Sequence, residues 1–178
     1  MKLYLLRHGQ TDYNNKKIIQ GDLPIELNEN GKKQAIDVKN QIEKLNIDLI
    51  ISSPIKRAVQ TAEIINQDLN VEFITDNRIS ERKFNKAIGQ NEKFYVDNLE
   101  LYWDLDKNFS GEYSVEKISK LVQRTKSFLQ EIKNKYNDKT VLVISHGSPI
   151  AALVKNITGE NIKETEIKNC ALLEYKCQ

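Results

Sequence analysis

The chain has 178 residues, of which 39% are hydrophobic and 29% are charged, values typical of a single soluble globular domain. Its 27 basic and 25 acidic residues leave a net charge of +2, so composition gives no reason to expect nucleic acid or a membrane as the partner. No apolar run approaches the roughly 20 residues that span a bilayer, and the first residues lack the pattern of a signal peptide. Two cysteines, Cys170 and Cys177, are too few for a disulfide framework, so we expect reduced thiols and a cytoplasmic protein.

Apolar runs alternate with stretches of helical apolar spacing along the chain. Strands are expected over residues 2–6, 48–51, 71–74, 140–144 and 171–175. Helices are expected over residues 28–45, 55–69, 114–136 and 149–158. Residues 80–113 are polar and aromatic without a regular pattern, and could contain one helix near 91–104. This alternation predicts an α/β fold with a mostly parallel sheet covered on both faces, and such sheets bind ligands beyond the C-terminal ends of their strands.

The two histidines of the chain, His8 and His146, occupy matching places in this pattern. Each directly follows a predicted buried strand, in LYLLRHG and in VLVISHG, and each is followed by a glycine. Glycine lets the backbone approach a ligand closely. Because the C-terminal ends of parallel strands meet at one edge of a sheet, we expect both histidines in one functional site.

Two arginines are expected at the same edge. Arg7 precedes the first histidine, and Arg57 lies in the first turn of the helix predicted after residues 53–54. The Ser-Pro pairs at 53–54 and 148–149 predict a serine N-cap followed by a proline in the first helical position. Helix N-termini and the forked arginine side chain both suit phosphate. A phosphoryl group is therefore the expected ligand, although capping alone would explain both serines.

The segment RHGQT at 7–11, followed by Asn14, resembles the opening motif of the histidine phosphatase superfamily, also called phosphoglycerate mutase-like. The resemblance continues through QG at 20–21, NENGKKQA at 28–35, SSPIKRAVQTA at 52–62, DNRISERKF at 76–84 and SHG at 145–147. It covers essentially the whole chain in the order of the family. The resemblance implies a three-layer α/β/α sandwich with a mixed, mostly parallel sheet. It further implies one domain over residues 1–178, with a short substrate-pocket insertion at 81–113.

The resemblance also implies a role for each site residue. His8 would accept the phosphoryl group, Glu81 would give and then take a proton, and three groups would stabilise the transferring phosphate, namely Arg7, Arg57 and His146. Further phosphate contacts are expected from Asn14, Gln20, Gly21, Gly147 and Ser148. The chain has no CxxC, HExxH, EF-hand or P-loop pattern, and we expect neither a metal nor a cofactor. The expected function is hydrolysis of a small phosphate monoester by a monomer or a homodimer.

Two other functions stay open at this point. A phosphoglycerate mutase would use 2,3-bisphosphoglycerate and extra segments that close its pocket, whereas the stretch from Glu81 to Gly111 is short. A non-catalytic binder of a phosphorylated ligand would usually lack one of the five core residues, and here all five are present. After Glu81 the chain reads FNKAIGQ where the family often has FGxWEG, so we expect residues 84–113 to decide a substrate specificity of its own.

Overall fold

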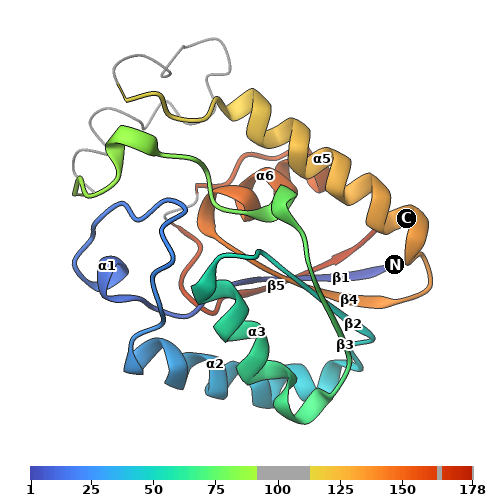
Figure 1. The fold of residues 1–178 in the computed structure, drawn as a ribbon. Coiled ribbons are helices and arrows are strands. Elements are labelled where there is room, and N and C mark those ends of the chain that lie inside the picture. The colour runs from blue at the N-terminus through green and yellow to red at the C-terminus, as the bar shows by residue number, and fades with distance from the viewer. Residues whose placement is uncertain (92–112, 164–165, 178) are drawn as a thin grey trace.

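A five-stranded sheet forms the centre of the computed structural model, which describes residues 1–91, 113–163 and 166–177 (Figure 1). The strands are β1 (Lys2–Arg7), β2 (Leu49–Ser52), β3 (Glu72–Thr75), β4 (Thr140–Ser145) and β5 (Leu172–Lys176). They lie in the order β3-β2-β4-β1-β5, with β5 antiparallel to β1 and the other neighbours parallel. The predicted α/β fold with a mixed, mostly parallel sheet is confirmed, and each strand lies within one residue of its expected bounds.

Helices cover both faces of the sheet (Figure 1). Helices α2 (Glu29–Ile42) and α3 (Lys56–Leu69) lie on one face, and helices α5 (Ile118–Lys135) and α6 (Gly147–Thr158) lie on the other. Among the described residues the connections contain the short helix α1 (Asp12–Asn15) and the 3₁₀ turns η1 (Glu43–Leu45), η2 (Asn77–Ile79) and η3 (Asn85–Ala87). In the part of the chain that the structure describes, no helix combines the length and apolar character needed to cross a membrane.

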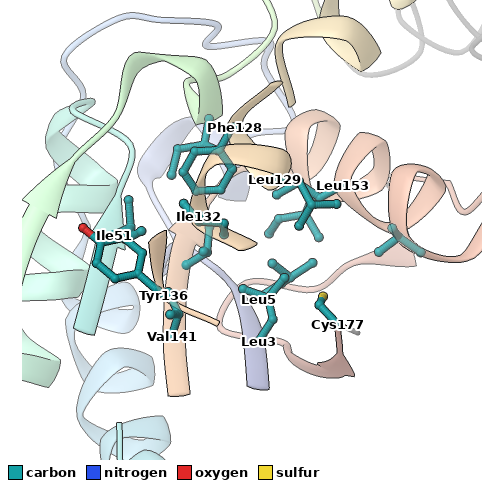
Figure 2. Close-up of a cluster of buried hydrophobic side chains, with 14 of the residues drawn as sticks. Leu3, Leu5, Ile51, Phe128, Leu129, Ile132, Tyr136, Val141, Leu153 and Cys177 are labelled. Atoms are coloured by element: carbon teal, nitrogen blue, oxygen red, sulfur yellow. The ribbon is translucent and has the colours of Figure 1, made fainter. Parts of the chain in front are cut away.

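Side chains alternate between the two faces along each central strand, so one sheet contributes to two cores. In β1, Leu5 packs in a cluster with Phe128 and other residues of α5 and α6 (Figure 2). Its neighbours Tyr4 and Leu6 pack instead with α2 and α3. Because both faces are covered by helices, both sets of strand residues are apolar, which is why these strands are continuous apolar runs in the sequence.

The start of α5 differs from the expected helix over 114–136. Helix α5 begins at Ile118, because the residues before it adopt other conformations. Ser114 has a φ of +51°, and the Glu116 amide donates to the carbonyl of Lys83 (2.8 Å). The expected helix near 91–104, and most of the segment 81–113, lie outside the described residues.

The expected serine N-caps are wrong. Ile55 occupies the N-cap position of α3, and His146 occupies that of α6. Helix α6 therefore begins at Gly147, two residues earlier than predicted, and contains Pro149 in its first turn. The proline is tolerated there because the first four N–H groups of a helix have no intrahelical partner.

Candidate active site

The sheet places the two histidines side by side. Strands β1 and β4 are parallel neighbours that pair Arg7 with Ser145, so the residue after each strand, His8 or His146, emerges at the same edge. The His8 amide also donates to the Ser145 carbonyl (3.0 Å), which extends the ladder by one residue. The ring centroids lie 5.0 Å apart, with 60° between the ring planes. The structure thus brings together the two histidines that the sequence analysis singled out.

The two ring nitrogens of His8 have different partners. Nδ1 lies 2.7 Å from the carbonyl oxygen of Gly9, which can only accept, so Nδ1 carries the hydrogen of the neutral ring. Nε2 accepts a hydrogen bond from Nε of Arg57 (3.1 Å). His8 is therefore held as the tautomer whose lone pair is on Nε2.

Arg57 is the buried cation of the site. It lies in the first turn of α3, and its side chain is fully buried. Beyond His8, its guanidinium donates from Nη1 to the carbonyl of Leu23 (3.1 Å) and from Nη2 to the carbonyl of Gly21 (2.7 Å). Gly21 has a φ of +51°, a conformation that glycine adopts at little cost. The predicted contact residue Gly21 thus helps to fix the side chain of Arg57 through its carbonyl group.

Burial is the main cause of the shifted pKa values in the site. It lowers the pKa of Arg57 to about 10, with the Glu81 carboxylate acting in the opposite direction, so the guanidinium stays charged at neutral pH. Burial also lowers the pKa of His8 and that of His146 well below 6.5, and the charges of Arg57 and Arg7 lower both further. Both imidazoles are therefore neutral at pH 7.

His146 has one partnered and one unpartnered ring nitrogen. Nε2 shares a hydrogen bond with Oγ of Ser53 (2.8 Å), and this Oγ also accepts from the amide of Ile55 (3.2 Å). Nδ1 is buried without a hydrogen-bond partner in the described part of the protein, and so is Nε of Arg7. Buried polar atoms without partners cost free energy. A ligand rich in oxygen atoms, bound at this edge, would supply the missing partners.

Arg7 and the first turn of α6 add further donors to the edge. Nη1 of Arg7 donates to the carbonyl of Ile167 (2.5 Å), which fixes the side chain at the end of β1. Gly147 and Ser148 are buried in the first turn of α6, where backbone N–H groups have no intrahelical partner. These two predicted phosphate contacts therefore lie beside His146.

The predicted contact residues Asn14 and Gln20 are joined through Thr11. The Thr11 hydroxyl lies 3.1 Å from Oδ1 of Asn14 and 3.0 Å from Oε1 of Gln20. Thr11 is also the N-cap of α1, where its side chain accepts from the Asn14 amide. The segment that follows His8 is thus tied to the segment that contains Gln20.

Three residues that were not predicted support the site. Thr61 on α3 accepts from the amide of Gly9 (3.1 Å), and Asn169 donates to the carbonyl of His8 (2.9 Å). Ser53 contacts the second histidine, as described above. Thr61 and Ser53 belong to the SSPIKRAVQTA segment, whose resemblance to the family could have indicated them. Asn169 has no comparable signal in the sequence.

The loop after β1 packs directly on α2 because glycines meet there. A Cβ atom on Gly9 would lie 2.4 Å from the carbonyl oxygen of Gly31, and a Cβ atom on Gly31 would lie 2.0 Å from that of Gln10. Neither distance is sterically allowed. Two positions without side chains thus fix the loop that holds His8.

Glu81, the predicted acid, lies between η2 and η3 and lines a cleft of about 940 Å³. The cleft is bounded by the loop at Asp22, the start of α3, residues 77–85 and the region around Lys120 at the start of α5. One carboxylate oxygen of Glu81, Oε1, accepts from the amide of Arg82 (2.8 Å). Among the described residues, no group of three or more His, Cys, Asp or Glu side chains is placed to hold a metal ion.

Comparison with known proteins agrees with this geometry. The model of the histidine phosphatase superfamily (branch 1) matches residues 3–178. The uncharacterized phosphatase PhoE of Bacillus subtilis is 32% identical over 174 residues, covering 94% of this chain and 84% of PhoE. The probable phosphoglycerate mutase GpmB of Escherichia coli is 30% identical over 182 residues, covering 97% of this chain and 83% of GpmB. Among solved structures, a phosphoserine phosphatase from Entamoeba histolytica in complex with 3-phosphoglyceric acid matches with a TM-score of 0.79 and 28% identity, over 97% of this chain and 89% of that one. The chain belongs to the histidine phosphatase superfamily, whose members similar to it are phosphatases and phosphoglycerate mutase-like proteins.

Proposed function

We propose that the chain is a metal-independent phosphatase that hydrolyses a small phosphate monoester through a phosphohistidine on His8. The hydrogen-bond pattern of His8 carries this proposal. Its Nδ1 is held by the carbonyl of Gly9, and the lone pair of Nε2 faces Arg57. A neutral imidazole held beside guanidinium groups is a nucleophile suited to an anionic electrophile. The phosphatases among the similar proteins support a small phosphorylated substrate.

In the first step, Nε2 of His8 forms a bond to phosphorus while the bond from phosphorus to the ester oxygen breaks. The Nε–H of Arg57 turns from Nε2 to a phosphoryl oxygen when the substrate binds, which frees the lone pair for attack. Arg57, Arg7 and His146 then stabilise the negative charge of the transferring group. Glu81 gives a proton to the leaving oxygen, so the product departs as an alcohol.

In the second step, water attacks the phosphorus of the phosphohistidine and the bond to Nε2 breaks. The Glu81 carboxylate takes a proton from this water, and inorganic phosphate leaves. Asn14, Gln20, Gly147 and Ser148 are proposed to contact the phosphate or hold the groups that do. Arginine side chains and backbone amides supply the charge stabilisation that a metal ion supplies in many phosphoryl-transfer sites, so we propose no metal and no cofactor.

Hydrolysis of p-nitrophenyl phosphate in excess EDTA tests this proposal. We expect turnover that EDTA leaves unchanged and that His8→Ala lowers by at least about 10³-fold. After an alkaline quench, mass spectrometry is expected to find phosphate on the peptide that contains His8. The matched variant His146→Ala removes the other histidine and is expected to be slower, with its label still on His8. Activity of His8→Ala near that of the wild type would refute the phosphohistidine, and loss of turnover in EDTA would refute the metal-independent reaction.

A cofactor-dependent phosphoglycerate mutase is the second candidate, favoured by the name of the similar Escherichia coli protein. It would transfer phosphate between hydroxyl groups with 2,3-bisphosphoglycerate as cofactor. The short stretch between Glu81 and Gly111 favours the phosphatase instead, because a mutase must exclude water while the intermediate reorients. Incubation with phosphoglycerates, with and without 2,3-bisphosphoglycerate, separates the two. Release of phosphate supports the phosphatase, and interconversion of the phosphoglycerates would reverse our preference.

A further inference from the structure

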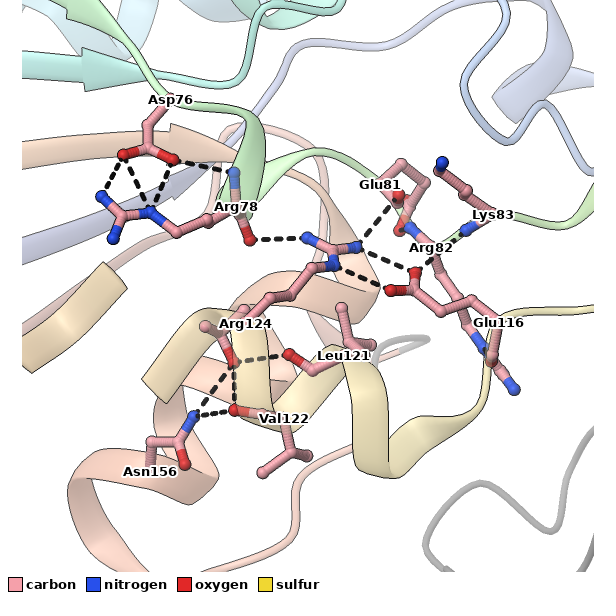
Figure 3. A network of polar contacts seen from close by, with 11 residues as sticks. Asp76, Arg78, Glu81, Arg82, Lys83, Glu116, Leu121, Val122, Arg124 and Asn156 are labelled. Carbon is pink, nitrogen blue, oxygen red and sulfur yellow. Dashed lines mark hydrogen bonds and ion pairs between the residues drawn. The ribbon is translucent and has the colours of Figure 1, made fainter. Parts of the chain in front are cut away.

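Arg124 of α5 holds the backbone at Arg78 and at Glu81 (Figure 3). Its Nη1 donates to the carbonyl of Arg78 (2.6 Å), and its Nη2 donates to the carbonyl of Glu81 itself (3.2 Å). The same guanidinium binds the Glu116 carboxylate in bidentate fashion, from Nε (2.9 Å) and from Nη2 (3.0 Å). These contacts engage four of its five N–H groups in the planar geometry that only arginine offers.

Glu116 contacts the residues that directly follow Glu81. Its Oε2 accepts from the amide of Lys83 (3.2 Å), and its own amide donates to the carbonyl of Lys83 (2.8 Å). Its carbonyl accepts from Nε of Arg82 (2.8 Å). Arg124 and Glu116 therefore hold the segment around Glu81 through the backbone of residues 78, 81 and 83 and through the side chain of Arg82.

The side chains of Arg124 and Glu116 are largely shielded from solvent. The side chain of Glu116 is 6% exposed and that of Arg124 is 19% exposed. Burial raises the pKa of Glu116, but the hydrogen bonds and charge of Arg124 outweigh it, and the pKa lies below its ordinary value. By contrast, Glu131, which pairs α5 with Arg78 of the same segment, is 59% exposed. Removing one partner of a buried pair leaves an uncompensated charge, whereas an exposed pair contributes little.

We infer that Arg124, held by Glu116, is the positioning residue for the acid Glu81. This inference rests on the proposed function, in which Glu81 gives a proton to the leaving oxygen. In this proposal Arg124 and Glu116, which line the same cleft as Glu81, form no bond to the reacting atoms. Their contribution is to keep the Glu81 carboxylate within reach of the ester oxygen, because a proton transfer requires hydrogen-bond distance.

A positioning role for the acid predicts that the loss of activity depends on the basicity of the leaving group. Phenyl phosphate and p-nitrophenyl phosphate have nearly the same shape, but phenolate is much the more basic leaving group and needs the proton more. Loss of a general acid costs about 10² to 10⁴-fold where the proton is needed. We expect Glu81→Gln to lose at least about a hundredfold in kcat/KM on phenyl phosphate and far less on p-nitrophenyl phosphate, because kcat/KM reports the transfer to His8 and not the hydrolysis step that both esters share.

The test measures kcat and KM on both esters for Arg124→Gln, for Glu116→Gln and for the control Glu131→Gln. We expect Arg124→Gln and Glu116→Gln to lose about tenfold more kcat/KM on phenyl phosphate than on p-nitrophenyl phosphate. Glu131→Gln removes an exposed pair between the same helix and segment, and we expect it to behave as the wild type. Arg124→Lys keeps the charge without the fork, is more apt to stay folded, and is expected to show the same selective loss. Combined with Glu81→Gln, Arg124→Gln is expected to add no selective loss, because the proton donor is already absent.

The outcomes separate the two levels of the proposal. Equal losses on both esters in Arg124→Lys and Glu116→Gln, or a selective loss that adds to that of Glu81→Gln, would overturn the positioning role alone. If the wild-type protein hydrolyses neither ester, or if Glu81→Gln shows no leaving-group selectivity, the proposed function is itself wrong in that part and the positioning role falls with it.

Discussion

Protonation of the two histidines is expected to make the folded protein less stable as pH falls below about 6.5. The chain contains only two histidines, and burial lowers the pKa of His8 and of His146 well below 6.5 in the folded state. In the unfolded chain both titrate near their ordinary value. Between the unfolded and the folded pKa values the unfolded state therefore binds more protons, so lowering the pH favours unfolding.

The expected size of the effect follows from this linkage. Each proton bound only by the unfolded state changes the free energy of unfolding by about 1.36 kcal/mol per pH unit. Two histidines give a limiting slope of about 2.7 kcal/mol per pH unit. Because their protonation in the unfolded chain is half complete at about pH 6.5, the loss over the next pH unit is about 2 kcal/mol. Against a typical total of about 5–15 kcal/mol, this is readily measurable.

Urea unfolding followed by circular dichroism between about pH 8 and pH 5.5 tests this linkage. His8→Gln and His146→Gln are each expected to remove about half of the slope, because each removes one of the two titrating groups. The variant with both substitutions gives the pH dependence of stability that is due to the carboxyl groups alone. A wild-type slope equal to that of the double variant would show that both histidines titrate alike in the folded and unfolded protein, and would refute the lowered pKa values of His8 and His146.

Two further predictions concern glycine contacts and thiols. Gly31→Ala is expected to cost at least about 1–3 kcal/mol in the free energy of unfolding by urea, because its Cβ would lie 2.0 Å from the Gln10 carbonyl oxygen. Gly159→Ala, where an added Cβ atom would have no described residue other than its chain neighbours within 4 Å, is expected to cost only about 1 kcal/mol for its positive φ; equal losses would contradict the close packing. Burial raises the pKa of Cys170 to about 12 and also raises that of Cys177, so a disulfide reagent at about pH 8 should label neither thiol before urea unfolds the chain. Rapid labelling of the folded protein would show that these thiols are accessible as thiolates.

The strands could be predicted from the sequence because a buried parallel strand leaves a local signal. Residues 3–6 and 141–144 are continuous apolar runs, and both faces of β1 and β4 are buried under helices. The signal does not depend on which strands pair, so it could be read before the strand order was known. The helix predicted over 28–45 is similar, because Asn28 is its N-cap and Val38, Ile42 and Leu45 pack in one core.

The start of α5 could not be predicted because a distant segment determines it. Val115 and Glu116 fit the apolar and polar spacing of the helix that follows. The carbonyl of Lys83 accepts a hydrogen bond from the amide of Glu116, and the carboxylate of Glu116 accepts one from the amide of Lys83. These contacts join residues more than thirty positions apart, and no window of local sequence contains both partners. The N-cap predicted at Ser53 failed for a related reason, since the Ser53 hydroxyl is hydrogen-bonded to the distant His146.

The family motifs identify the phosphate chemistry more firmly than the leaving-group chemistry, and the fold explains why. Arg7, His8 and His146 follow from the ends of two paired strands, and Arg57 is buried against the same edge. Glu81 instead lies on a segment that α5 holds from outside the sheet, and it lines the cleft that the rest of a substrate would enter. In this segment the chain departs from the family just after Glu81, with FNKAIGQ at 84–90. We therefore propose that the groups that transfer phosphate are those common to the family, and that the segment where this chain differs recognises the alcohol that leaves.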